Sequence, residues 1–176
     1  MDFGQELKQL LLREPRWTLA AAESLTCGRV QARIGAVSGA SNFFLGGLTA
    51  YSLDQKVRHL GVDRVHAESV CGVSQRVAEE MARGASALFG SDLAVGTTGY
   101  AEAAAERGVR TPLAWWALWH DLRDGRAAVR SGLIEAPGTE RTRMQELVAD
   151  IVLGELVRYL REVRGQAPGP APSPFK

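Results

Sequence analysis

Residues 17–28 read Trp17-Thr-Leu-Ala-Ala-Ala-Glu-Ser-Leu-Thr-Cys-Gly28, an apolar run that ends in a polar turn. The apolar part has the length of a buried strand, and Val30, Ile34 and Val37 then recur at helical spacing. The stretch therefore predicts a strand that turns directly into a helix over about 26–37. Ser24 lies at this turn, where its hydroxyl can face the backbone N–H groups of the helix start.

Helical and strand-like patterns alternate on both sides of this stretch. Leu7, Leu10 and Leu11 predict a helix over 3–14, which Pro15 ends. Further strands are expected at 46–51, 93–97, 113–119 and 127–134, and further helices at 52–59, 74–88 and 139–163. The last two strands form a hairpin. This order predicts an α/β fold, a three-layer α/β/α sandwich with a mixed sheet.

The size of the chain indicates a single domain. Its 176 residues are 45% hydrophobic, which is enough to bury one core. We therefore expect one domain over 1–163. Residues 164–176 contain four prolines and are expected to form a disordered tail.

The composition excludes several classes of partner. Lys and Arg number 21 against 20 Asp and Glu, so no basic excess indicates a nucleic-acid or membrane partner, and a small molecule is expected instead. No apolar run approaches the roughly 18 residues that span a bilayer, and the first residues do not resemble a secretory leader, which predicts a cytoplasmic protein. The two cysteines and three histidines show no ligand spacing, so neither a metal nor another cofactor is predicted.

A serine, a tyrosine and a lysine come close together in the sequence around this turn. Tyr51 and Lys56 flank the expected helix start at 52, and a neutral lysine can remove the proton of a nucleophilic serine. The N–H groups of the 24–28 turn are candidate donors to an oxyanion. Taken singly, Ser24 is also explained as a helix cap, Tyr51 as packing and Lys56 as a solvated charge.

Other prominent residues have structural interpretations as well. Glu23 is a carboxylate favourably placed at a helix N-terminus, and Cys27 is interpreted as a small buried hydrophobe in preference to a reactive thiol. Trp115, Trp116 and Trp119 lie on one strand, where core packing with a covered outer face is favoured over a binding platform or a dimer interface.

Taken in order, the motifs resemble those of the CinA C-terminal domain family. The family pattern is close to AESxTGG, GxSxxFxxGxxxYSNxxK, LGV, GxVS and TGxAGPxGG. The matching residues here are Ala22-Glu-Ser-Leu-Thr-Cys-Gly28, Ser38-Gly-Ala-Ser41, Phe44, Gly46, Tyr51-Ser52, Lys56, Leu60-Gly-Val62, Gly72-Val-Ser74, Val77-Ala78, Met81-Ala82, Gly84 and Thr98-Gly99. The resemblance covers about residues 5–160.

The resemblance implies an α/β sandwich, often homodimeric, and a hydrolase activity. Members include nicotinamide-nucleotide amidohydrolases of pyridine nucleotide salvage, which convert the carboxamide of nicotinamide mononucleotide to nicotinate mononucleotide and ammonia. It implies that Ser24 is the nucleophile, Lys56 the base and Tyr51 the hydrogen-bonding partner of Lys56. The residues expected to bind substrate are Glu23, Thr26, Gly28, Thr98, Gly99 and Arg141, of which Arg141 matches the arginine of a GDR segment and is expected to bind phosphate or support the lysine.

The chain also departs from the family pattern. Cys27 stands where the family has glycine, at a place where an unusual dihedral angle is expected, and Leu53 replaces the asparagine of YSN. TGxAGPxGG is replaced by Thr98-Gly-Tyr-Ala-Glu-Ala-Ala-Ala105, so a loop binding phosphate or ribose through its backbone N–H groups would be rebuilt here. The favoured function is a Ser–Lys amidohydrolase, and the alternative is a non-catalytic paralogue that binds a nucleotide or a partner protein.

Overall fold

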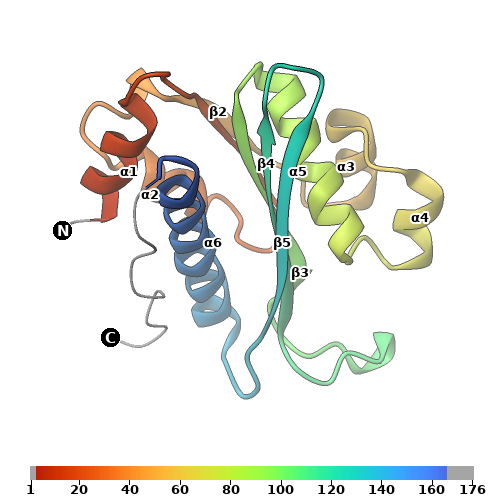
Figure 1. The fold of residues 1–176 in the computed structure, drawn as a ribbon. Coiled ribbons are helices and arrows are strands. Elements are labelled where there is room, and N and C mark those ends of the chain that lie inside the picture. Colours follow the sequence, from red (N-terminus) through yellow and green to blue (C-terminus); the bar gives the residue numbers. More distant parts are fainter. Residues whose placement is uncertain (1–2, 166–176) are drawn as a thin grey trace.

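A five-stranded mixed sheet forms the centre of the molecule in the computed structural model, which describes residues 3–165 (Figure 1). The strands are β1 (Leu19–Glu23), β2 (Phe44–Thr49), β3 (Leu93–Tyr100), β4 (Leu113–Asp121) and β5 (Ala127–Glu135), in the order β2-β1-β3-β4-β5. Strand β1 pairs in parallel with β2 and β3, whereas β4 is antiparallel to both of its neighbours. The predicted mixed sheet and its hairpin are confirmed.

Helices cover both faces of this sheet (Figure 1). One face carries α1 (Phe3–Leu12), α2 (Arg29–Gly35) and α6 (Arg141–Val163), and the other carries α3 (Leu53–Leu60), α4 (Arg64–Ser69) and α5 (Gln75–Phe89). The alternation of side chains along β1 serves both faces: Leu19 and Ala21 belong to one core, and Ala20 and Ala22 to the other. The predicted three-layer sandwich is therefore confirmed.

Several local features differ from the sequence-based prediction. Cys27 is exposed and is not a small buried hydrophobe, and β2 runs over Phe44–Thr49 instead of 46–51. Helix α2 begins at Arg29 and not near Thr26, because residues 24–28 form a turn in which Cys27 and Gly28 have φ angles of 50° and 90°. Helix α4 was not predicted. It is six residues long and buries only Ala67, so it leaves no helical stripe in the sequence.

The tryptophans of β4 pack into the interior, as the favoured interpretation predicts. Trp116 belongs to the core beneath α6, while the half-buried Trp115 and Trp119 pack against Ala78 and Ala82 of α5 on the opposite face. Small residues on α5 thus make room for two indole rings. The alternation of the strand explains why neighbouring tryptophans serve different layers.

The residues that follow α6 pack against the N-terminal part of the chain. The guanidinium of Arg164 lies 3.5 Å from the ring centroid of Trp17, and Arg164 and Gly165 form a turn after α6. Residues 166–176, the greater part of the predicted tail, lie outside the described residues. Within residues 3–165, no helix has both the length and the apolar character needed to cross a membrane.

Helices α3 and α5 approach closely at Gly84. A Cβ atom at this position would lie 2.1 Å from the carbonyl oxygen of Leu60, the last residue of α3. We expect Gly84→Ala to lower the free energy of unfolding by about 2 kcal/mol or more, because backbone must move to admit the methyl group. Urea denaturation followed by circular dichroism measures this difference.

The matched control is Gly35→Ala, at the end of α2, where an added Cβ meets nothing within 4 Å. This variant should be as stable as the wild type or more stable by a few tenths of a kcal/mol, because alanine favours the helix. Equal stability of both variants would contradict the close packing of α3 on α5.

Candidate active site

Three parallel strands bring the predicted site residues to one edge of the sheet. Ser24 follows β1, Tyr51 follows β2, and Thr98 lies near the end of β3. Since the carboxyl ends of parallel strands meet at the same edge, residues far apart in the sequence become neighbours there. Helix α3 starts directly after Tyr51 and carries Lys56 in its first turn.

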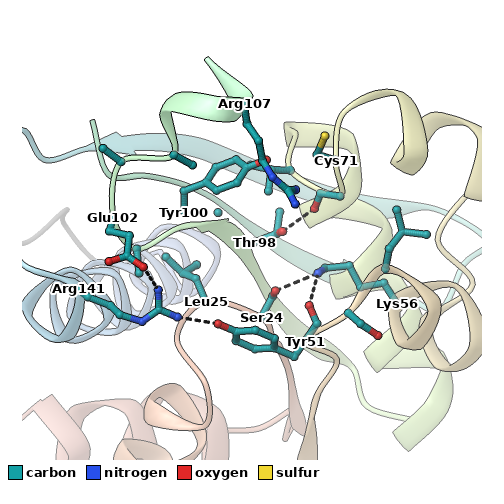
Figure 2. Close-up of a pocket in the computed structure, with 18 of the residues that line it drawn as sticks. Ser24, Leu25, Tyr51, Lys56, Cys71, Thr98, Tyr100, Glu102, Arg107 and Arg141 are labelled. Atoms are coloured by element: carbon teal, nitrogen blue, oxygen red, sulfur yellow. Dashed lines mark hydrogen bonds and ion pairs between the residues drawn. The ribbon is translucent and has the colours of Figure 1, made fainter. Parts of the chain in front are cut away.

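These residues line an open cleft with a volume of about 620 Å³ (Figure 2). Its walls come from the turn after β1, the start of α3, the turn at 71–73, the β3–β4 connection and the start of α6. A cleft of this volume suits a small molecule.

Ser24 and Lys56 meet at the inner end of the cleft. The Lys56 Nζ atom donates a hydrogen bond to Ser24 Oγ at 2.9 Å and another to the main-chain carbonyl of Tyr51 at 3.1 Å (Figure 2). The two residues are only 6% and 4% exposed. Lys56 is therefore not the solvated surface charge that its position on a helix also allowed.

Burial changes the chemistry of the Lys56 amine. Removal of the charged form from water lowers its pKa from 10.5 to about 8. At pH 7 about a tenth of such amines are neutral, compared with fewer than one in a thousand for an ordinary lysine. This lysine can thus act as a proton acceptor near neutral pH.

Glu23 is not among the residues that line the cleft, and its side chain shapes the turn behind Ser24. Its carboxylate is completely buried and accepts hydrogen bonds from the backbone N–H groups of Gly28, Val30 and Gln31 at 2.9, 3.2 and 2.9 Å. These are the otherwise unpaired donors of the first turn of α2. The alternative interpretation, a carboxylate placed at a helix N-terminus, is the one that the structure supports.

Thr26 and Gly28 belong to the same turn behind Ser24 and do not line the cleft. The Thr26 hydroxyl is fully buried and lies 2.8 Å from the Thr97 hydroxyl, and the Gly28 N–H is used by Glu23. Both residues thus hold the turn in place, and the structure puts neither of them in the wall of the cleft. The Thr26 side chain thus faces β3 and the interior.

One residue of the turn that lines the cleft has a backbone N–H without an acceptor among residues 3–165. The amides of Ser24, Cys27 and Gly28 bond to Thr97, Ser24 and Glu23, respectively. Leu25 lines the cleft, and its N–H has no acceptor among residues 3–165. The amide that follows the serine is thus the best-placed donor for an oxyanion.

Tyr51 contributes differently from the prediction. Its phenol lies 2.7 Å from Nη2 of Arg141, and its only hydrogen bond with Lys56 uses the main-chain carbonyl. The first turn of α3 places the amine beneath this carbonyl, while the half-exposed ring extends toward the cleft mouth (Figure 2). The side chain is therefore a partner of Arg141 and not of the lysine.

The other expected residues occupy distinct positions. Thr98 and Gly99 line the cleft, and the Thr98 hydroxyl is buried and donates to the Gly72 carbonyl at 2.7 Å. Arg141 lies at the mouth, where it pairs with Glu102. Within residues 3–165, no group of three or more His, Cys, Asp or Glu side chains is arranged to hold a metal ion.

Several lining residues were not identified from the sequence. Cys71, Tyr100, Glu102, Glu106 and Arg107 all reach the cleft. Four of them lie within eight residues after Gly99, so their place at the end of a parallel strand was the available signal. Cys71 gave no comparable signal, because it depends on a turn with a positive φ of 51°.

The fold and the dyad together define a three-layer α/β protein with a serine–lysine site at the carboxyl edge of its parallel strands. Residues 3–160 match the family model of the CinA C-terminal domain, and the chain belongs to this family.

Relatives and solved structures agree with this assignment. The chain is 38% identical over 157 residues to a CinA-like protein of Chlorobium limicola, an alignment that covers 88% of this chain and 36% of that protein. It is 43% identical over 100 residues to a putative competence-damage inducible protein of Streptococcus equi subsp. zooepidemicus, covering 57% of this chain and 23% of that one. The chain thus spans about a third of the length of its curated relatives, or less.

Two crystal structures share the fold at lower sequence identity. A competence-damaged protein (CinA) superfamily protein from Klebsiella pneumoniae has a TM-score of 0.82 at 22% identity, covering 92% of this chain and 97% of that one. A competence/damage inducible protein, CihA, from Agrobacterium tumefaciens has a TM-score of 0.74 at 24% identity, covering 92% and 96%.

The buried lysine should reduce the stability of the fold. We expect Lys56→Met to raise the free energy of unfolding at pH 7 by up to about 3 kcal/mol. This is the free energy that corresponds to lowering the lysine pKa from 10.5 to about 8. The loss of the two hydrogen bonds of Lys56 makes the observed gain smaller. Between about pH 8 and 10.5 the unfolded wild type holds a proton that the folded state has released, so wild-type stability rises with pH in this window. The advantage of the variant should therefore be constant below pH 8 and shrink above it.

Chemical denaturation at several pH values tests this expectation. Lys8→Met, on the outer side of α1, is the control for losing a lysine as such. A Lys56→Met variant that is less stable than the wild type at pH 7 and at pH 10 alike would show that burial of the charge is not unfavourable.

Proposed function

We propose that this protein is a Ser–Lys amidohydrolase that converts the carboxamide of nicotinamide mononucleotide, or of a related pyridine nucleotide, to the corresponding acid and ammonia. The observation that carries the proposal is the 2.9 Å hydrogen bond between Ser24 Oγ and the buried Lys56 amine, whose pKa is lowered to about 8. Membership of the CinA family supports the choice of substrate through the resemblance described above.

In the first step, Ser24 Oγ attacks the carbonyl carbon of the amide. Lys56 is neutral in the reactive form: one amine hydrogen donates to the Tyr51 carbonyl, which leaves the nitrogen lone pair to accept the Ser24 proton. The negative charge that develops on the carbonyl oxygen is stabilised by the Leu25 N–H. Both side chains are largely buried, so the proton passes directly between them.

In the second step, the Lys56 ammonium returns this proton to the leaving nitrogen, which departs as ammonia and leaves an ester on Ser24. A water molecule then attacks the ester and gives a proton to the neutral lysine. Expulsion of the Ser24 oxygen, which takes the proton back, releases the acid. Lys56 therefore serves as base and acid in turn, and the proton balance closes within the dyad.

Ammonia release from nicotinamide mononucleotide tests the proposal. The wild type should release one ammonia per acid formed, and Ser24→Ala should lower kcat by at least about a thousandfold because no other group can form the ester. Ser41→Ala removes an exposed hydroxyl outside the cleft and should keep wild-type activity.

The non-catalytic alternative makes the opposite prediction for the same assay. It is supported by the departure of the 99–112 loop from the family pattern and by the three tryptophans of β4. Stabilisation of the folded wild type by nucleotides in a thermal-shift experiment, without any ammonia release, would favour this alternative and reject the hydrolase.

The pH dependence of the reaction should follow the lysine. Because only the neutral amine accepts the serine proton, kcat/KM should rise with an apparent pKa near 8, and at pH 7 it should be about a tenth of its plateau. Lys56→Arg, which cannot become neutral, should be inactive at every pH. A rate that is constant between pH 6 and 9 would exclude Lys56 as the base.

A further inference from the structure

We propose that Glu102 is a specificity-determining residue, which pairs with Arg141 and thereby weakens the binding of amides that carry a phosphate at the mouth of the cleft. The inference rests on the proposed function, because it concerns which amide substrates the same site accepts.

The guanidinium of Arg141 is engaged on both of its outer nitrogens. Nη1 donates to a carboxylate oxygen of Glu102 at 2.5 Å, and Nη2 donates to the Tyr51 hydroxyl at 2.7 Å. These are two of the donors with which an arginine binds a phosphate bidentately. A phosphate at this place must displace the Glu102 carboxylate or accept a like charge beside it.

The pair lies where the far end of a substrate would be. Figure 2 shows Tyr51 between Arg141 and the Ser24–Lys56 pair, with Glu102 on the outer side of the guanidinium. A molecule whose amide reaches Ser24 therefore extends past the tyrosine ring toward Arg141. Glu102 comes from the β3–β4 connection and Arg141 from the first turn of α6, so the contact joins two separate walls of the cleft.

The second arginine of the cleft has an acidic neighbour as well. Arg107 lies 6.0 Å from the Tyr100 ring centroid, and its Nε is 3.9 Å from a carboxylate oxygen of Glu106. When Lys56 is neutral, the two arginines and two glutamates among the lining residues balance in charge. The mouth thus gives no net attraction to a dianionic phosphate, whereas an amide with an uncharged end loses nothing there.

The exposure of the pair sets the size of the effect. Arg141 and Glu102 are 45% and 62% exposed, so water and salt weaken their attraction and a ligand can separate them. We therefore expect a change of about tenfold in binding, and not complete exclusion of phosphate.

The test compares nicotinamide mononucleotide with nicotinamide riboside, which differ only by the phosphate. In Glu102→Gln, the ratio of kcat/KM for the mononucleotide over the riboside should rise about tenfold, mainly through a lower KM for the mononucleotide, with kcat unchanged. Glu162→Gln is the matched control, because it makes the same change in charge at the other end of α6 and also frees an arginine, Arg130. A ratio within twofold of wild type in Glu102→Gln, or an equal rise in the control, would overturn the proposal.

A binding experiment keeps this test separate from catalysis. Inorganic phosphate titrated calorimetrically into the protein should bind about tenfold more tightly to Glu102→Gln than to the wild type. In the double variant that also carries Arg141→Ala, this increase in phosphate affinity should be absent. If neither amide is hydrolysed, the proposed function fails, while the phosphate titration still decides the role of Glu102. Equal phosphate affinity in wild type and Glu102→Gln would reject that role.

Discussion

The contact of the Lys56 amine with the Ser24 hydroxyl is the constraint around which the site is built. A lysine that is 4% exposed must lose most of its water, and only two hydrogen bonds replace it. The 71–73 turn covers the amine, since a Cβ at Gly72 would lie 3.9 Å from Nζ. The Thr98 hydroxyl fixes this turn to β3 through the Gly72 carbonyl. The lowered pKa of Lys56 is thus a consequence of how three separate segments close over one side chain.

The serine is held just as firmly from the other side. Glu23 satisfies three backbone N–H groups of α2 at once, and this requires the tight turn in which Cys27 and Gly28 adopt positive φ. Cys27 replaces the glycine of the family pattern there, and a non-glycine residue in this conformation costs roughly 1 kcal/mol. Its φ of 50° shows that the turn keeps its shape despite this cost. The buried carboxylate therefore dominates over the local preference of the cysteine.

Sequence reasoning predicted those features that depend on periodicity and on the order of strands. The layers follow from apolar patterns, whereas the pairing of Ser24 with Lys56 was expected from the family resemblance. The structure explains that pairing by two parallel strands that end at one edge. The direction of individual side chains was not predictable in this way. Tyr51 could point to the lysine or to the mouth, and only the position of Arg141, from a helix 90 residues later, decides between them. Glu23 likewise looks like a site residue in the sequence, because its three partners become visible only when the turn is folded.

The two ends of the cleft differ in what holds them together. At the inner end, buried groups and main-chain bonds fix Ser24 and Lys56, so substitutions there disturb the fold as well as the chemistry. At the mouth, Glu102 and Arg107 belong to an exposed connection whose contacts are side-chain pairs on the surface. Such pairs contribute little to stability, and their replacement leaves the sheet and the dyad intact. The mouth can therefore vary in charge independently of the Ser24–Lys56 contact, which is why a loop unlike the family pattern is compatible with an intact serine–lysine pair.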